Sequence, residues 1–429
     1  MINQNLELAI NGGKPAIPGD QVFKAYNTIG AEEKDAACRV IDSGILSGFV
    51  ASWGEDFLGG AEVQSFEREW ERAFDVKHAI STNSWTSGLF TMIGAIGIEP
   101  GDEVIVSPWT MSATATAIIM WGGIPVFSDI EKDFFCIDPD KVEALITPAT
   151  KAILTVDIFG QSSDIGRLQS ICDRHSLKLL SDTAQAPGST HKGKKTGTLC
   201  DIGGFSLNYH KHIHTGEGGV LVTDDDVLAL RMRLIRNHAE CSVLKSGIKD
   251  ISNMVGGNYR MCEIEAAMGK CQLKKLEASI KDRQRVAESF SMHLSTLRGI
   301  QLPQIRDNNT HVFYTFPIIL KDDDLIIKST EIYNALIAEG ILGLGKGYVN
   351  LIELPMYQQK IAFGRNGYPW NLQKGSATNY SLDACPTAAH YHNNALLNLE
   401  ICLFAYPEND IELVASAFHK VWRKIESLG

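Results

Sequence analysis

The first candidate for chemistry is Lys211, which lies among small and polar residues just before a glycine-rich turn. An apolar run at 202–207 precedes it, and the turn 216–219 leads into a second apolar run at 220–223. These signals predict a lysine on a loop held between two strands. Burial there would lower the pKa of Lys211 and supply a neutral amine that can attack an aldehyde. A surface-loop lysine is the alternative, because lysine is seldom buried.

A carboxylate that could assist such a lysine is Asp182, which ends the apolar run 177–181 and is followed by small residues. Parallel strands open into ligand crevices at their carboxyl ends, which is where this pattern places Asp182. A carboxylate there can hold a pyridinium nitrogen protonated, as pyridoxal phosphate (PLP) requires in order to accept electrons. Capping of a helix in a strand-to-helix turn would explain the same aspartate.

A phosphate-binding turn is predicted near residue 85. Residues 81–95 have the pattern of a strand end, a turn rich in hydroxyl groups and a helix. Backbone N–H groups at the helix start, with the hydroxyls of Ser84 and Thr86, can bind a phosphate dianion. Helix capping accounts for these residues without a ligand. The order of phosphate turn, Asp182 and Lys211 along the chain is what favours a PLP site.

With these residues in place, the chain resembles the fold-type I PLP enzymes that act on sugars, the DegT/DnrJ/EryC1/StrS aminotransferase group. The resemblance covers nearly the whole chain, and four boxes carry it in the family's order. The boxes are Asn83, Ser84 and Thr86; Asp182-Thr-Ala-Gln185-Ala; Phe205, Ser206, Lys211 and Gly216-Glu217-Gly218-Gly219; and Asn258-Tyr-Arg260-Met-Cys-Glu263. Two positions depart from them, since Trp85 stands where glycine is usual and Thr183 is a variant.

The resemblance implies a role for each matched residue. Lys211 would form the Schiff base with PLP and then move a proton between the substrate carbon and the cofactor. Asp182 would pair with the pyridine nitrogen, and Gln185 would reach the phenolic oxygen. The phosphate would be bound by Ser84, Thr86, Ser206 and the amide around Trp85.

The fourth box implies a homodimer with shared active sites. In the family that it resembles, Asn258 and Arg260 would arrive from the neighbouring subunit, because the site is built at a dimer interface. The alternative is that residues 258–260 only open the helix that begins near Glu263.

The activity that the resemblance implies is transfer of an amino group from glutamate or glutamine to a ketosugar, through pyridoxamine phosphate. Three substrate classes stay open: a nucleotide-linked sugar, a free keto-sugar acid such as an oxidised octulosonate, and a cyclitol ketone. One alternative is a sugar dehydratase or isomerase of the same fold, although the dehydratases place histidine where this chain has Lys211. Another is a regulatory protein that only binds PLP, against which the intact set of site residues argues.

Two departures concern the substrate side of the site. Met111 stands where the family usually has an aromatic residue that stacks on the cofactor ring. Met111 can replace it through a sulfur–π contact, or Trp109 can, and packing of both in the core is the alternative. Asp157 stands where relatives commonly carry histidine, and we expect it to contact the substrate rather than to serve only a turn.

A run of alternating histidines surrounds the lysine. In an extended segment His210, His212 and His214 would share one face, and such a run suggests zinc. No cysteine or carboxylate cluster lies nearby in the sequence, and a metal would compete for Lys211. We therefore expect no metal, with His210 or His212 lining the substrate pocket.

Composition is that of a cytoplasmic enzyme. The 429 residues with 44% hydrophobic content can bury two cores, and the net charge of −11 argues against nucleic acid or an anionic membrane surface as a partner. The nine cysteines show no Cys-x-x-Cys spacing, which predicts reduced thiols. We expect no signal peptide and no membrane span, since no run approaches the ~20 apolar residues that a span needs.

The order of strand-like and helix-like segments predicts an α/β fold. Alternating βα segments over residues 104–222 favour a mostly parallel sheet with helices on both faces, followed by a smaller C-terminal α+β domain. We expect an N-terminal arm at 1–30, a large PLP-binding domain at 31–270 and a small domain at 271–429. Helices are predicted at 32–43, 63–74, from 263 toward 297 and at 410–425, and C-terminal strands at 314–320 and 399–404.

One long segment, 343–380, is rich in glycine, tyrosine and proline. Loops of this length in compact domains are more often functional than not. In the family that this chain resembles, the corresponding region helps to cover the substrate. We expect it to form a wall of the pocket, with plain surface packing as the alternative.

Overall fold

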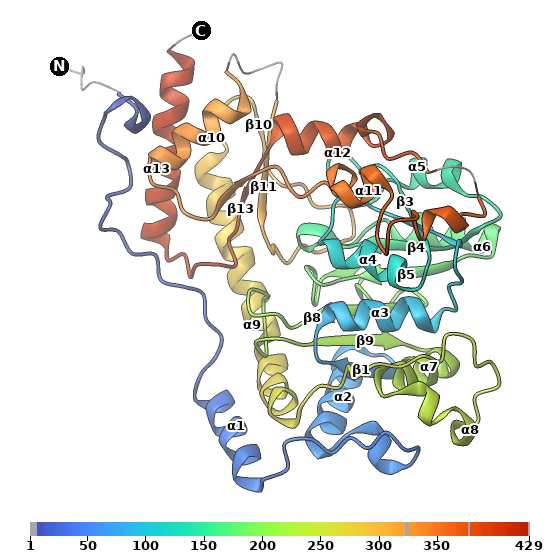
Figure 1. Ribbon diagram of the computed structural model, residues 1–429. Coiled ribbons are helices and arrows are strands. Elements are labelled where there is room, and N and C mark those ends of the chain that lie inside the picture. The colour runs from blue at the N-terminus through green and yellow to red at the C-terminus, as the bar shows by residue number, and fades with distance from the viewer. Residues whose placement is uncertain (1–6, 322–324, 326, 376–377, 428–429) are drawn as a thin grey trace.

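The computed structural model describes residues 7–321, 325, 327–375 and 378–427 and contains a large and a small sheet (Figure 1). The large sheet has the order β1-β9-β8-β5-β4-β2-β3. Its strands β8, β5, β4, β2 and β3 run parallel, and β9 pairs antiparallel with both β8 and β1. The strands are β1 (His78–Thr82), β2 (Glu103–Val106), β3 (Ile124–Phe127), β4 (Thr150–Val156), β5 (Lys178–Asp182), β8 (Ile202–Ser206) and β9 (Gly219–Thr223). The predicted mostly parallel sheet is confirmed.

Helices cover both faces of this sheet. Strands β2, β8 and β9 are therefore buried along their whole length. One face packs against α3 (Trp85–Ala95), α4 (Ser112–Met120) and α7 (Asp226–Arg236), and the other against α2 (Ala61–Phe74) and α6 (Ile165–His175). The predicted helix at 63–74 is confirmed, and its apolar stripe is buried against β8 and β9. Short elements at the periphery are α5 (Pro139–Val142), α8 (Val243–Ser246), β6 (Thr190–His191) and β7 (Lys194–Lys195).

The small sheet is antiparallel and has the order β10-β11-β13-β12. Its strands are β10 (Ile300–Gln301), β11 (Phe316–Leu320), β12 (Leu344–Lys346) and β13 (Leu396–Leu399), and it packs against α10 (Ser329–Ala338) and α13 (Glu408–Glu426). The strand predicted at 399–404 was wrong. The apolar stretch that pairs with both neighbours ends at Leu399, and residues 400–404 leave the sheet to form a turn and a bridge to the N-terminal arm.

A single long helix, α9 (Glu263–Leu294), runs from the large sheet to the small one (Figure 1). Its first half buries Ala266 and Leu276 against α2 and β8, and its second half buries Val286 and Phe290 in the core of the small domain. The domain boundary expected at residue 270 therefore falls inside a continuous helix.

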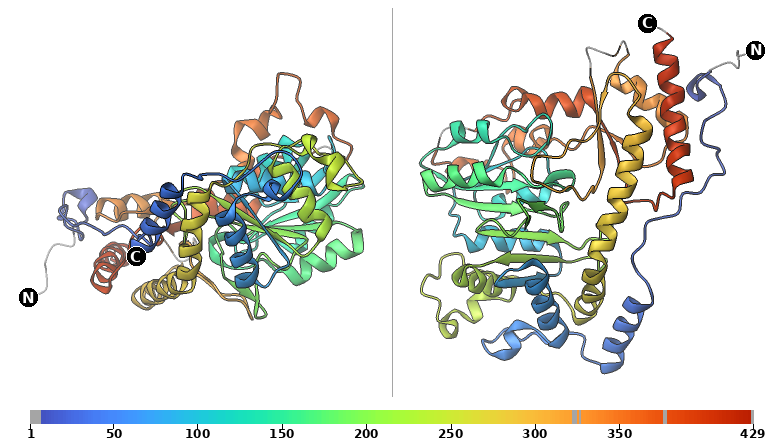
Figure 2. Two further views of the ribbon diagram at one scale, coloured as in Figure 1. Left: turned by 90° about the horizontal axis from the view of Figure 1, so that it is seen from below. Right: turned by 180° about the vertical axis from the view of Figure 1, so that it is seen from behind.

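The N-terminal arm lies along the small domain before it reaches α1 (Ala31–Ser43), as Figure 2 shows from behind. Leu8, Ile17 and Phe23 join the apolar core of that domain. The backbone N–H groups of Ala9 and Ala16 donate to the two oxygens of Glu339, at 2.8 and 2.7 Å. Residues 1–6 of the expected arm lie outside the described residues.

All nine cysteines are free. Cys136, Cys172, Cys385 and Cys402 are buried, Cys38 and Cys241 are exposed, and the other three are half-buried. Among the described residues, no helix is both long and apolar enough to cross a bilayer. The last two short helices, α11 (Pro355–Gln359) and α12 (Pro386–His390), lie in the stretch between β12 and β13.

Candidate active site

The three predicted signals converge on one pocket. The start of α3, the end of β5 and the loop between β8 and β9 meet there, since α3 packs on β8 and β9 and since β5 and β8 are neighbours in the sheet. The pocket is lined by these predicted residues: Ser84, Trp85, Thr86, Met111, Asp182, Gln185, Ser206, His210 and Lys211. The residues Asp157, His212, Asn258 and Arg260 were also predicted but do not line it.

Lys211 is buried on the loop between β8 and β9, as its flanking sequence predicted. Its Nζ lies 4.1 Å from the centroid of the Tyr314 ring, and it makes no hydrogen bond or ion pair with any described residue. Burial lowers the pKa of Lys211 to about 8, against the opposing attraction of the Asp182 carboxylate. Tyr314 comes from the small domain, and no local sequence signal placed it beside the lysine.

We expect the reactivity of Lys211 toward an electrophile to rise around pH 8, because only the neutral amine reacts. The protein would be treated with hydroxylamine to remove any bound aldehyde and then acetylated across a pH series. Peptide mapping would follow Lys211, with the exposed Lys34 as the internal reference. Identical pH profiles for the two lysines would contradict the lowered pKa.

Asp182 is held by three hydrogen bonds. The indole Nε1 of Trp85 donates to its Oδ1 at 2.8 Å, the hydroxyl of Thr114 donates to its Oδ2 at 2.7 Å, and the backbone N–H of Ala184 donates to Oδ1 at 3.2 Å. Burial raises the pKa of the Asp182 carboxyl, while the bonds from Thr114 and Trp85 oppose that rise. No local sequence signal indicated these three contacts.

Gln185 connects the pocket to two other segments. Its Oε1 accepts from the backbone N–H of Phe159 at 2.8 Å, and its Nε2 donates to the hydroxyl of Tyr348 at 2.9 Å. Tyr348 belongs to the long segment 343–380, which therefore reaches the site at this point. Farther along the segment, Tyr357 and Tyr380 pack against Phe127 at the sheet edge. This part of the segment therefore packs on the domain instead of forming a wall of the pocket.

The expected phosphate end of the pocket lies at the start of α3. Ser84 is the N-cap residue, and its Oγ accepts from the backbone N–H of Ser87 at 3.1 Å. The first N–H groups of a helix have no partner inside the helix, so those of Trp85 and Thr86 are available to an anion. Ser206 closes this end from β8, and its Oγ accepts from the N–H of Asn208 at 3.3 Å.

The two residues considered for stacking on a cofactor ring differ in position. Trp109 is fully buried among Phe135, Phe159 and Tyr348 and does not line the pocket, which is the core-packing alternative. Met111 lines the pocket with 58% of its surface exposed. Of the two, only Met111 is placed where a ring contact can form.

Asp157 does not line the pocket, contrary to the substrate contact that we expected. Its side chain is fully buried and accepts from the N–H of Ser163 at 2.9 Å and from the hydroxyls of Ser181 and Thr183, each at 2.7 Å. Asp157 thus ties the end of β4 to the end of β5, which is the turn alternative. The hydrogen bond from Thr183 to Asp157 also gives threonine a structural role at position 183, where this chain departs from the family pattern.

The histidine alternation was also misread. The segment around Lys211 is a series of turns and bends, so its alternate residues share no face. His212 is fully buried with its Nε2 2.7 Å from the carbonyl oxygen of Val312, so its expected place in the pocket is wrong. His210 lines the pocket. Burial first, and then the charge of Lys211, lowers the pKa of His210 to about 4, so the imidazole is neutral at neutral pH.

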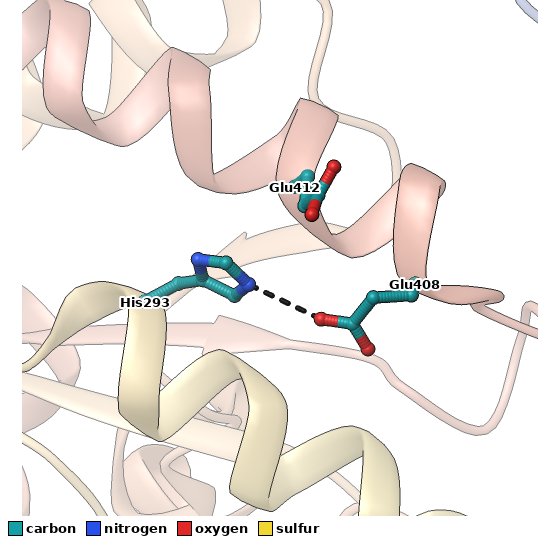
Figure 3. Close-up of side chains that lie close together, drawn as sticks. All are labelled: His293, Glu408 and Glu412. Atoms are coloured by element: carbon teal, nitrogen blue, oxygen red, sulfur yellow. Dashed lines mark hydrogen bonds and ion pairs between the residues drawn. The ribbon is translucent and has the colours of Figure 1, made fainter.

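One group among the described residues has the composition of a metal site, and it lies elsewhere. His293 on α9 faces Glu408 and Glu412 on α13 (Figure 3). The Nε2 of His293 lies 3.2 Å from Oε1 of Glu408, which also accepts from the hydroxyl of Ser289 at 2.6 Å. Both carboxylates are exposed, and these contacts explain the group as a set of hydrogen bonds between two helices. None of the three residues lines the pocket.

Asn258 and Arg260 lie beside the turn at the start of α3 but do not line the pocket. The N–H of Asn83 donates to the carbonyl of Tyr259 at 3.0 Å, and the Nε of Arg260 donates to Oδ1 of Asn258 at 2.8 Å. The Asn258 side chain is exposed and Arg260 is half-buried. Within one chain, therefore, neither residue reaches the lysine.

Comparison with known proteins places this site in a family. The model of the DegT/DnrJ/EryC1/StrS aminotransferase family matches residues 50–370. Spore coat polysaccharide biosynthesis protein SpsC of Bacillus subtilis is 32% identical over 80% of this chain and 86% of its own, and L-glutamine:2-deoxy-scyllo-inosose aminotransferase of Streptomyces kanamyceticus is 31% identical over 97% of both chains. The crystal structure of an aminotransferase from Psychrobacter cryohalolentis superposes with a TM-score of 0.80, at 26% identity, over 94% of this chain and 100% of its own.

Proposed function

The chain belongs to the DegT/DnrJ/EryC1/StrS aminotransferase family, and we propose from its site that it transfers an amino group from glutamate or glutamine to a ketosugar or a cyclitol ketone. The family and its relatives establish the reaction class as PLP-dependent sugar transamination. The observation that carries the proposal is the single pocket in which a buried lysine, a buried carboxylate and a helix start meet.

The residues of the pocket fit PLP. The Lys211 amine is buried and makes no hydrogen bond or ion pair with any described residue, which is unusual for a cation unless a reaction uses it. When bound, PLP supplies an electron sink for the bonds around the carbon that carries nitrogen. In our proposal Asp182 binds the ring nitrogen, Gln185 the phenolic oxygen, and Ser84, Thr86, Ser206 and the amide of Trp85 the phosphate.

Lys211 has the two properties that proton transfer requires. A pKa near 8 leaves part of the amine neutral near neutral pH, and Lys211 lines the pocket. Tyr314 packs under the Nζ and stabilises the ammonium form through a cation–π contact when the amine holds a proton. His210, neutral beside it, can accept or donate a hydrogen bond to a substrate hydroxyl without adding charge.

The acceptor class that we propose is supported by how much of this chain its relatives cover. GDP-perosamine synthase of Caulobacter vibrioides aligns over 63% of this chain, whereas the inosose aminotransferase aligns over 97%. Alignment over almost the full length supports a free cyclitol ketone or keto-sugar as the acceptor, with glutamine or glutamate as the donor. The cytoplasmic location and the lack of nucleic-acid and membrane partners stay predictions.

The proposal is tested in the reverse direction. Holoenzyme would be mixed with a panel of amino cyclitols, free amino sugars and nucleotide-linked amino sugars, and the loss of the PLP absorbance band followed as the cofactor takes up nitrogen. Glutamate and glutamine would be tested separately as donors. Loss of the PLP band with a free amino cyclitol or a free amino sugar supports the proposal. Loss of the band with nucleotide-linked amino sugars alone would contradict the proposed acceptor class.

We further propose a homodimer in which Asn258 and Arg260 complete the partner's site. The exposed side chain of Asn258 and the half-exposed one of Arg260 support this, because a residue that serves a second subunit must reach the surface of its own. Mixing Lys211→Ala protein with Asn258→Ala/Arg260→Ala protein should restore about a quarter of wild-type turnover, since half of the randomly formed dimers have one complete site. The measurement is turnover after subunit exchange.

Each variant alone serves as the inactive control. A mixture of Lys211→Ala with Lys211→Ala/Asn258→Ala/Arg260→Ala protein cannot build a complete site and should stay inactive. If exchange is demonstrated by mass and the first mixture also stays inactive, the two residues act within their own chain or outside catalysis.

A further inference from the structure

Trp85 connects the two ends of the proposed cofactor site. It is the first residue of α3, so its backbone N–H belongs to the phosphate turn, while its indole Nε1 donates to Oδ1 of Asp182 at 2.8 Å. We propose that Trp85 is a positioning residue, which keeps the Asp182 carboxylate ionised and oriented so that the proton it shares with the cofactor stays on the ring nitrogen. This inference rests on the proposed function.

Glycines of α3 and β8 leave the space that the indole ring fills, and a glycine of β9 lies against the Trp85 backbone. A Cβ on Gly204 of β8 would lie 2.2 Å from Cη2 of Trp85, and one on Gly88 of α3 would lie 2.7 Å from Cε3. A Cβ on Gly219 of β9 would lie 2.8 Å from the Trp85 Cα. Real Cβ atoms do not approach this closely, so these glycines leave the space that the tryptophan fills. The N–H is thereby aimed at Asp182 by packing that is separate from the bond itself.

The hydrogen bonds to Asp182 leave room for one more donor. A carboxylate offers about four acceptor positions, two on each oxygen. Trp85 and Ala184 occupy both positions on Oδ1, and Thr114 occupies one on Oδ2. The open position is therefore on Oδ2. Thr114 uses its single hydroxyl hydrogen to donate to Asp182. The hydroxyl of Thr110, 2.7 Å from that of Thr114, must therefore donate to Thr114.

Burial by itself raises the pKa of the Asp182 carboxyl. No described lysine or arginine forms an ion pair with it. The groups that favour the carboxylate are the donors from Thr114, Trp85 and Ala184 and, more weakly, the nearby charge of Lys211. Removing the indole N–H leaves a more basic carboxyl group. The proton that it shares with the ring nitrogen should then move toward Asp182.

The test is the nitrogen resonance of ¹⁵N-labelled PLP bound to Trp85→Phe protein. Phenylalanine keeps an aromatic ring in the glycine-lined space but removes the N–H. We expect the equilibrium of the shared proton to shift by about tenfold from the ring nitrogen toward Asp182, equivalent to about 1.4 kcal/mol, with the resonance moving toward the neutral-pyridine position. The matched control is Trp70→Phe, since Trp70 is fully buried and its Nε1 has no partner among the described residues.

The outcomes are distinct. A resonance that stays in place in Trp85→Phe, or that moves equally in Trp70→Phe, would limit Trp85 to packing. Failure of the wild-type protein to take up labelled PLP would overturn the proposed function, and this inference with it. If Trp85→Phe protein does not fold, 3-benzothienylalanine at position 85 keeps the indole shape with sulfur in place of the N–H, and the same resonance decides.

Discussion

Reduction of the PLP-loaded protein with borohydride should fix the cofactor on Lys211, and Lys211→Ala should lower turnover by at least about 10⁴-fold. The expected loss is large because one amine both bonds to the cofactor and moves the proton. Lys211 is the amine that lines the pocket, and its pKa near 8 makes it the reactive one. An alanine there leaves no nitrogen with which to do either.

The label would be located by peptide mapping, and turnover by conversion of an accepted amino sugar. Lys245→Ala is the matched control, because Lys245 is exposed on α8 and does not line the pocket. Its label and turnover should equal those of the wild type. Label on another lysine would show that the whole site is assigned wrongly.

Asp182→Asn should lower the rate of the half-reaction by about 10²-fold or more and weaken PLP binding much less. Asparagine has the shape of aspartate, so its Oδ1 can still accept from Trp85 while its Nδ2 donates to Thr114. The packing survives, and the negative charge beside the ring nitrogen is lost. The effect should therefore fall on the chemical step.

Single-turnover absorbance with glutamate would measure the half-reaction, and a titration with PLP would measure binding. Asp157→Asn is the matched control, since Asp157 is an equally buried carboxylate that bonds to a turn rather than lining the pocket. That variant should lose stability and retain the half-reaction rate. A normal rate in Asp182→Asn would mean that the ring nitrogen has another partner.

The chemical groups of the site and their order could be predicted from the sequence because each depends on local signals. Asp182 ends an apolar run, Ser84 opens a helix, and Lys211 sits between two strands, and all three places were confirmed. The helix 63–74 was recognised for the same reason, since its apolar residues repeat with the period of a helix. Where the period was assumed rather than present, at the histidines around Lys211, the prediction failed.

Only the tertiary structure decided which side chains meet. Trp85 and Asp182 are 97 residues apart, Gln185 and Tyr348 are 163 apart, and no local pattern records either contact. The outcomes for Asp157 and His212 depended on such contacts too, because a polar residue faces a ligand or the core according to its neighbours. Periodicity reports which face of an element is apolar, whereas the partner of a buried polar atom is set by how the elements pack. The sequence by itself thus determined the elements and the reacting groups, and the packing of α3, the two sheets and the β8–β9 loop decided their partners.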